Sequence, residues 1–219
     1  MEDRRREKDD ESGHVYINGK GRQVPGVTTV LGMLNKPSLL GWANWLGTKQ
    51  VNVDAFLEQR AEIGTDFHSL VENYMTGKSV EGEHFNEAIK LFTKFRDWAR
   101  CHYYKVYQAE VTLVGESFAG TVDAIGEVDG HFCVVDYKTS KDIHKSQFIQ
   151  LAGYSLLIKE LLPETYEKIE AFGIVTMRCS KYCHKFIPKK ELEERFVPVF
   201  KNLLQVYWSC KEMDETTYF

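Results

Sequence analysis

The first half of the chain carries apolar residues at the spacing of an α-helix. Within the range 27–100, apolar side chains recur every three or four residues, and short polar breaks with Gly or Pro interrupt the pattern. The pattern predicts helices over 28–35, 38–50, 53–61, 65–76 and 84–102. We expect Thr65 or Asp66 to cap the helix that carries His68. A hairpin is predicted before this region, around the turn at 18–21.

The pattern changes near residue 106, where apolar and polar residues begin to alternate. Alternation between short turns predicts an antiparallel meander, and a helix and further strands follow it. The expected strands are 106–114, 118–128, 132–137 and 169–178, with 182–187 a candidate for one more, and the expected helix is 146–161. The last periodic stretch, 189–212, is predicted to be helical, with a break or kink at Pro198.

These elements predict one α/β domain with a helical N-terminal elaboration. The order is helices, then βββ-α-β, then a closing helix. Residues 1–12 are nearly all charged and are expected to form a flexible tail before a single domain at 13–219. Within that domain, 27–102 is the helical elaboration, 103–188 the core and 189–219 the closing helix.

Composition and charge narrow the class of protein. Hydrophobic residues make up 43% of the 219 and charged residues 27%, which excludes a mostly disordered chain or a coiled coil. The net charge of −4 excludes a wholly basic nucleic-acid coat, although a local groove can still bind DNA. We find neither an apolar run of the roughly 18 residues that a membrane helix needs nor a signal peptide, so we expect a soluble intracellular protein with free thiols at its five cysteines.

Two aspartates and a lysine carry the candidate chemistry. Asp123 lies on one predicted strand, and Asp136 and Lys138 lie two residues apart on the next, so they project from one face. Converging carboxylates are costly unless a cation binds them, and hard oxygen ligands suit Mg²⁺ or Mn²⁺. A lysine beside the metal can orient a water or stabilise charge on a phosphate. The alternative is a solvated lysine at the surface end of a strand.

The order of the motifs resembles the PD-(D/E)xK nuclease superfamily, and most closely its RecB-like exonuclease branch, which includes phage and mitochondrial exonucleases. Residues 136–139 read Asp-Tyr-Lys-Thr, Gln150 and Tyr154 follow on a helix, and Gly64 and His68 precede them. The resemblance covers roughly residues 25–178. It implies a restriction-endonuclease-like core, with a central mixed sheet built as βββ-α-β.

The resemblance also implies roles for individual residues. Asp123 and Asp136 would bind one or two Mg²⁺ or Mn²⁺ ions together with the Tyr137 backbone carbonyl and His68, and Lys138 would be catalytic. Glu110 would be a further ligand. Residues that would support the site or contact DNA are Gln150, Tyr154, Lys141, Arg178, Lys181 and Lys185.

Each of these roles has a simpler alternative. His68 sits among apolar residues and could be a packed histidine, and Glu110 could be a surface charge. Gln150 and Tyr154, spaced i and i+4, could form a core edge. The basic run at 178–190 could be a solvated hairpin rim or a phosphate-tracking edge with stacking aromatics.

Other cofactors are not expected. Relatives with a four-cysteine iron–sulfur cluster carry one cysteine upstream, whereas Cys101 is the first cysteine here. Zinc needs four ligands, and only Cys179, Cys183 and His184 cluster. No Walker A sequence is present, so no nucleotide is expected.

The function expected is a metal-dependent DNA exonuclease that acts from a free end. The helical region would form a passage favouring single-stranded DNA, and the resemblance places the role in recombination, repair or phage DNA metabolism, in a bacterial cytoplasm if phage-encoded. A single-strand annealing or binding protein is a candidate partner. The alternatives are a structure-specific endonuclease on the same fold and a non-catalytic DNA-end-binding protein.

Overall fold

The structure, a computed structural model, describes residues 15–34, 37–178 and 182–214. The predicted tail at 1–12 lies outside these ranges. The centre of the fold is a five-stranded sheet in the order β3-β4-β5-β6-β7. Its strands are β3 (Lys105–Val114), β4 (Ala119–Val128), β5 (His131–Lys138), β6 (Ala171–Thr176) and β7 (Cys183–Pro188).

The sheet is mixed. Strands β5 and β6 are parallel, and the other neighbouring pairs are antiparallel. The connection between the parallel strands contains α5 (Lys145–Leu161) and α6 (Pro163–Lys168), as a parallel crossover requires. Strand β6 is buried along almost its whole length, which explains its continuous apolar sequence. The predicted α/β fold with a βββ-α-β core is confirmed.

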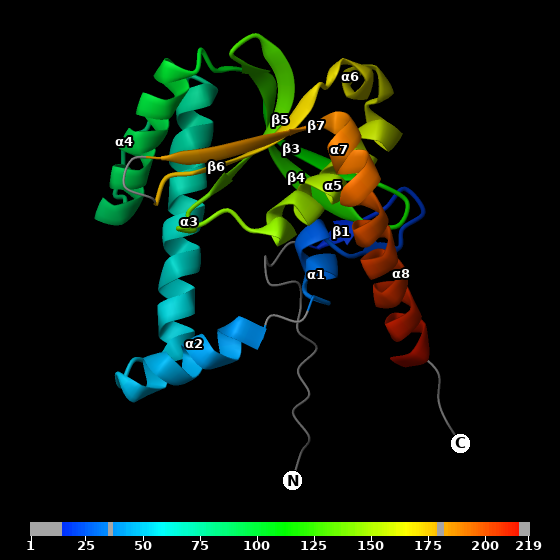
Figure 1. The fold of residues 1–219 in the computed structure, drawn as a ribbon, viewed down its shortest axis with the longest axis horizontal. Coiled ribbons are helices and arrows are strands. Elements are labelled where there is room, and N and C mark those ends of the chain that lie inside the picture. Colours follow the sequence, from blue (N-terminus) through cyan, green and yellow to red (C-terminus); the bar gives the residue numbers. More distant parts are fainter. Residues whose placement is uncertain (1–14, 35–36, 179–181, 215–219) are drawn as a thin grey trace.

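Helices cover both faces of the sheet (Figure 1). Helices α1 (Val27–Leu31), α5 and α8 (Val197–Asp214) contribute to one hydrophobic core, together with α7 (Lys189–Arg195). Helices α3 (Val53–Met75) and α4 (Asn86–Cys101) contribute to the other core. The sheet thus separates two cores, and α3 is the helix that carries His68.

The prediction of two helices over 53–76 is wrong, because α3 runs unbroken from Val53 to Met75. Gly64 lies inside the helix, so neither Thr65 nor Asp66 is a cap; Asn52 caps the helix and accepts a hydrogen bond from a backbone N–H. A glycine in a helix interior costs about 1 kcal/mol relative to alanine. Burial of the apolar face of α3 in the second core offsets that cost.

The remaining elements frame the sheet. Strands β1 (Tyr16–Ile17) and β2 (Gln23–Val24) form the predicted hairpin, and α2 (Pro37–Thr48) leads into α3. The predicted break near Pro198 is confirmed, because α7 ends at Arg195 and α8 begins at Val197.

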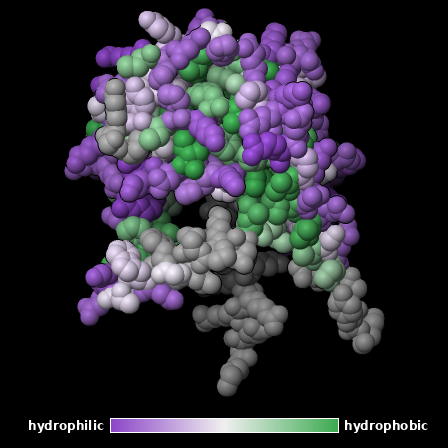
Figure 2. Space-filling view, viewed as in Figure 1, coloured by the Kyte–Doolittle hydropathy of each residue, from purple (hydrophilic) through white to green (hydrophobic). Residues whose placement is uncertain are grey.

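One face of the molecule has both hydrophilic and hydrophobic areas. Figure 2 shows hydrophilic residues over much of the face, and a hydrophobic area over α8 and α1. In the part of the chain that the structure describes, no helix is both long and apolar enough to cross a membrane.

Candidate active site

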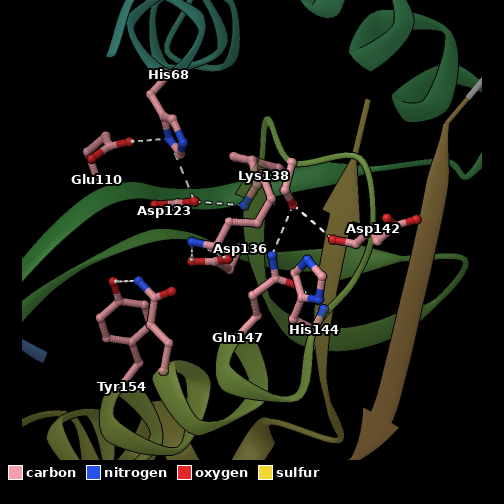
Figure 3. A network of polar contacts seen from close by, with 12 residues as sticks. His68, Glu110, Asp123, Asp136, Lys138, Asp142, His144, Gln147 and Tyr154 are labelled. Atoms are coloured by element: carbon pink, nitrogen blue, oxygen red, sulfur yellow. Dashed lines mark hydrogen bonds and ion pairs between the residues drawn. The ribbon is translucent and has the colours of Figure 1, made fainter. Parts of the chain in front are cut away.

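Three side chains from three different elements meet above the sheet. His68 reaches down from α3, Glu110 lies on β3 and Asp123 lies on β4 (Figure 3). One ligand atom from each lies within 4.8 Å of the others. His68 Nδ1 is 3.7 Å from Asp123 Oδ2 and 3.8 Å from Glu110 Oε1. We call His68, Glu110 and Asp123 the open cluster, because His68 and Glu110 keep 29% and 32% of their side chains exposed.

The backbone of Glu110 adopts an unusual conformation. Its φ is +50°, although it lies within a strand and the residues on either side keep their pairing with β4. A left-handed φ is disfavoured for a residue with a Cβ, and such residues concentrate at functional sites. The geometry places Glu110 across from Asp123 at a cost in backbone energy.

A second pair lies beside the open cluster, on β5. Asp136 is 1% exposed, and Lys138 Nζ lies 3.0 Å from its Oδ1 and 2.8 Å from its Oδ2. We call these two residues the buried pair. The alternative of a solvated lysine at a surface strand end is wrong, because Lys138 keeps only 22% of its side chain exposed and neutralises a buried carboxylate.

The strand backbone links the open cluster to the buried pair. The N–H of Tyr137 donates to Asp123 Oδ2 at 2.7 Å, so Asp123 is fixed by the residue between Asp136 and Lys138. The Tyr137 ring lies in the second core, where its hydroxyl lies 2.5 Å from that of Tyr104. The role predicted for its carbonyl stays a prediction.

The electrostatics of the site follow from burial and close charges. Burial raises the pKa of Asp136 to about 6 against the opposing effect of Lys138, and burial also raises the pKa of Asp123. Burial lowers the pKa of His68, but the carboxylates of Asp123 and Glu110 outweigh it and the net shift is upward. Carboxylates crowded in this way gain most from a bound cation.

The donor set fits a divalent metal ion. Asp136 Oδ2 is buried and receives no hydrogen bond from the described residues, although it lies within ion-pair distance of Lys138. Lys138 supplies one positive charge there, and a cation bound by the neighbouring carboxylates would supply more. Carboxylate oxygens with one imidazole suit Mg²⁺ or Mn²⁺. The open cluster and Asp136 would hold such an ion.

Gln150 and Tyr154 lie together on α5, next to the site. Gln150 Nε2 donates to the Tyr154 hydroxyl at 2.8 Å, and both residues are buried. Tyr154 packs on β4 at Gly120, where a Cβ would lie 2.8 Å from the tyrosine ring. Any other residue at position 120 would therefore displace the tyrosine. Their contact with DNA stays a prediction.

Sequence reasoning missed the residues that fix the loop after Lys138. Gln147 Nε2 donates to Ser140 Oγ at 3.1 Å, and the Thr176 hydroxyl donates to the Ser140 carbonyl. Gln147 also accepts from the backbone N–H of His144 in a capping box at the start of α5. The sequence did hold one indication of this role: Gln147 lies three residues before Gln150, so both project from one side of the predicted helix.

A cleft of about 330 Å³ opens beside the open cluster. Its lining residues come from α3, from β3 and β4, from α5 and from the region of α1: Tyr16, Gly26, Val27, Thr28, Glu72, Glu110, Thr112, Gly120, Thr121 and Tyr154. Glu72, one turn after His68 on α3, is a lining residue that sequence reasoning did not single out. Glu110 is thus both part of the open cluster and part of the cleft wall.

Among the described residues, the basic residues predicted to bind DNA lie on or after strands β5, β6 and β7. Lys141 is exposed in the loop after β5, and Lys185 lies over an aromatic ring of α5. Arg178 donates from Nε to the Thr139 carbonyl at 2.6 Å and forms an ion pair with Glu87. Lys181 lies outside the described residues. Their contacts with DNA stay predictions.

Comparison with known proteins identifies a family. A sequence model of the PD-(D/E)XK nuclease superfamily matches residues 82–215, more than half of the chain. The match includes the buried pair, Glu110 and Asp123, whereas His68 lies before it. A crystal structure of SSO0001 is similar, with a TM-score of 0.41, 16% sequence identity and coverage of 91% of this chain and 85% of that one. No curated protein matches the chain.

Proposed function

Because the chain belongs to the PD-(D/E)XK nuclease superfamily, we propose that it is a metal-dependent exonuclease that hydrolyses DNA from a free end. Superfamily membership makes it a nuclease with a nucleic acid as substrate. The observation that carries the proposal is the open cluster, which holds three metal-ligating groups within 4.8 Å on the wall of a cleft. The run at 136–139, with Gln150 and Tyr154, supports a place in the RecB-like branch.

The residues of the site would have different roles in hydrolysis. The open cluster and Asp136 would hold one or two Mg²⁺ or Mn²⁺ ions, which supply Lewis-acid activation of a phosphate and lower the pKa of a bound water. Lys138 keeps its charge, because Asp136 and Asp123 raise its pKa despite burial. Its ammonium can therefore stabilise negative charge that develops on the scissile phosphate. Tyr137 holds Asp123 in place through its backbone N–H.

Preference for a single strand and for an end is part of the proposal. The cleft beside the open cluster has a volume of about 330 Å³, and α3 contributes Glu72 to its wall. A single strand that threads from its end would suit a site of this size, whereas a duplex is bulkier than one strand. A RecB-like enzyme of this kind would act inside the cell in recombination, repair or phage DNA metabolism, where a single-strand annealing or binding protein would be its partner.

The test compares linear and circular forms of one single-stranded DNA with Mg²⁺, with Mn²⁺ and with a chelator. We expect degradation of the end-labelled linear strand with either metal, slower degradation of blunt duplex, and an intact circle. The Lys138→Met variant is the control for contaminating nuclease. Cleavage of the circle at a comparable rate would favour an endonuclease, and binding without cleavage of any form would favour a non-catalytic end-binding protein.

A further inference from the structure

Two arginines from distant segments share one carboxylate oxygen. Arg60 of α3 and Arg178, which follows β6, place Nη1 and Nη2 at 2.7 and 2.8 Å from Glu87 Oε1. An arginine keeps its charge under all ordinary conditions. Two positive charges on one negative charge leave an excess of about one positive charge at this point of the surface.

This pair of arginines lies next to the loop that follows Lys138. Arg178 Nε donates to the carbonyl of Thr139, the residue that follows Lys138. The Thr139 hydroxyl lies 3.7 Å from where a Cβ on Gly64 would be, so α3 passes close to the same loop. Arg60 is one turn before Gly64 on the face of α3 that carries His68. At 1.5 Å per residue, Arg60 is about 12 Å along the helix from His68. This distance corresponds to about three or four nucleotides of a DNA strand.

The two guanidinium groups are accessible to a ligand. The exposed fractions of the side chains are 34% for Arg60 and 25% for Arg178, and Glu87 is 40% exposed. A guanidinium fork matches a phosphate with two parallel hydrogen bonds.

We propose that Arg60 and Arg178 form a binding site for a backbone phosphate of the DNA strand, outside the open cluster and the buried pair. The inference rests on the proposed function, since it takes DNA as the substrate. Glu87 holds both guanidinium groups in place and lowers the net charge of the site. The phosphate binds to the nitrogens that Glu87 and Thr139 leave available, and it positions the strand beside Lys138.

A purely structural role for the same network makes a different prediction. If the network only joined α3, α4 and the end of β6, substitution of any member would lower the stability of the protein. DNA affinity would then not rise in any variant. As a phosphate site, the network gains net positive charge in Glu87→Gln, which keeps the shape of the side chain. DNA affinity then rises in Glu87→Gln and falls when either arginine is replaced.

The experiment measures binding of a labelled oligothymidylate to the full chain in chelator, by fluorescence anisotropy over a range of salt concentrations. We expect Arg60→Ala to bind the oligonucleotide about tenfold more weakly, because the variant loses a charge-assisted hydrogen bond to a phosphate. The double variant Arg60→Ala/Arg178→Ala should reduce the slope of log affinity against log salt by about 0.7, the loss of one phosphate contact on a single strand. Glu87→Gln should bind about threefold more tightly.

Matched controls come from α7, where Arg195 pairs with Glu191 far along the chain from the site. Arg195→Ala and Glu191→Gln should leave binding unchanged, and Arg60→Gln guards against a folding defect in the alanine variants. Thermal unfolding is recorded for each protein. Variants that melt earlier but keep the wild-type affinity and salt slope would overturn the phosphate site and assign the network to structure. A wild-type protein that neither binds nor cleaves DNA would instead overturn the proposed function.

Discussion

The open cluster and the buried pair lie within one site but balance their charges in opposite ways. In the buried pair, Asp136 is neutralised by Lys138 two residues along the same strand. In the open cluster, His68 Nδ1 lies 3.8 Å from Glu110 and 3.7 Å from Asp123, which is longer than a strong hydrogen bond. Asp136 thus has a close positive partner within the protein, whereas the open cluster would gain one from a bound cation.

Because the open cluster and the buried pair differ in burial and in charge balance, substitutions in them should change different measured quantities. Substitution in the open cluster removes a candidate metal ligand, and two of these side chains are partly exposed. Metal affinity and cleavage rate should therefore change more than the stability of the protein. Substitution in the buried pair leaves an uncompensated group inside the protein, so stability should change as well. The predictions below use this difference.

The largest effect is expected for Asp123→Asn. Asparagine can still accept the hydrogen bond from the Tyr137 N–H through its carbonyl oxygen, so the fold should persist. Removing the charge should lower the cleavage rate by about 10³-fold or more and weaken Mn²⁺ binding in calorimetry. The control is Asp129→Asn, an exposed carboxylate paired with His102. Unchanged Mn²⁺ affinity in Asp123→Asn would show that the open cluster does not bind the metal.

The next effect combines activity with stability. Lys138→Met should abolish cleavage and also destabilise the fold by about 3–5 kcal/mol, because Asp136 then stays buried without a partner. The double variant Asp136→Asn/Lys138→Met should regain most of that stability and none of the activity. Urea unfolding of both variants tests the pair. Lys159→Met, an exposed lysine 4.0 Å from Glu193, should change stability by less than about 1 kcal/mol. A Lys138→Met protein as stable as wild type would contradict the buried pair.

The sequence predicted the part of the site that lies on regular strands. Alternation and short turns placed Asp123 and Asp136 on neighbouring strands, and two-residue spacing placed Lys138 with Asp136. The sequence could not predict which carboxylate the lysine neutralises, because that depends on burial. Nor could it predict the continuity of α3 through Gly64, since tertiary packing overrides a local propensity of about 1 kcal/mol.

Long-range contacts account for most of what sequence reasoning missed. Arg60 and Arg178 are 118 positions apart, as 178 − 60 gives, and only the folded chain brings both to Glu87. The left-handed backbone of Glu110 has no local signal either, since neither glycine nor asparagine stands there. Within the basic run at 178–190, the described lysines have separate partners, and the choice between a solvated rim and a phosphate-tracking edge stays a prediction. Lys189 lies over the ring of Tyr166, and Lys190 is near Glu194.

A smaller effect should separate the ligand role of Glu110 from its backbone strain. Glycine adopts φ of +50° without a penalty, so Glu110→Gly should be more stable than Glu110→Ala by about 1 kcal/mol. Both variants should weaken Mn²⁺ binding to a similar degree, because both lack the carboxylate. Thermal unfolding and calorimetry on the same samples make the test. Equal stability of the two variants would show that the strand relaxes to an ordinary φ once the carboxylate is gone.

The smallest effect, a difference between two metals, is expected for His68→Ala. An imidazole nitrogen contributes more to binding of Mn²⁺ than of the harder Mg²⁺, so the loss of cleavage should be roughly threefold greater with Mn²⁺. The open cluster keeps Glu110 and Asp123 in this variant, and these oxygen ligands are sufficient for Mg²⁺. The ratio of rates with the two metals, measured on one linear single strand, cancels any general loss of folded protein. His131→Ala, an exposed histidine paired with Glu170, should leave the ratio unchanged. An equal loss with both metals would mean that His68 positions the carboxylates or the DNA from α3 and does not bind the metal itself.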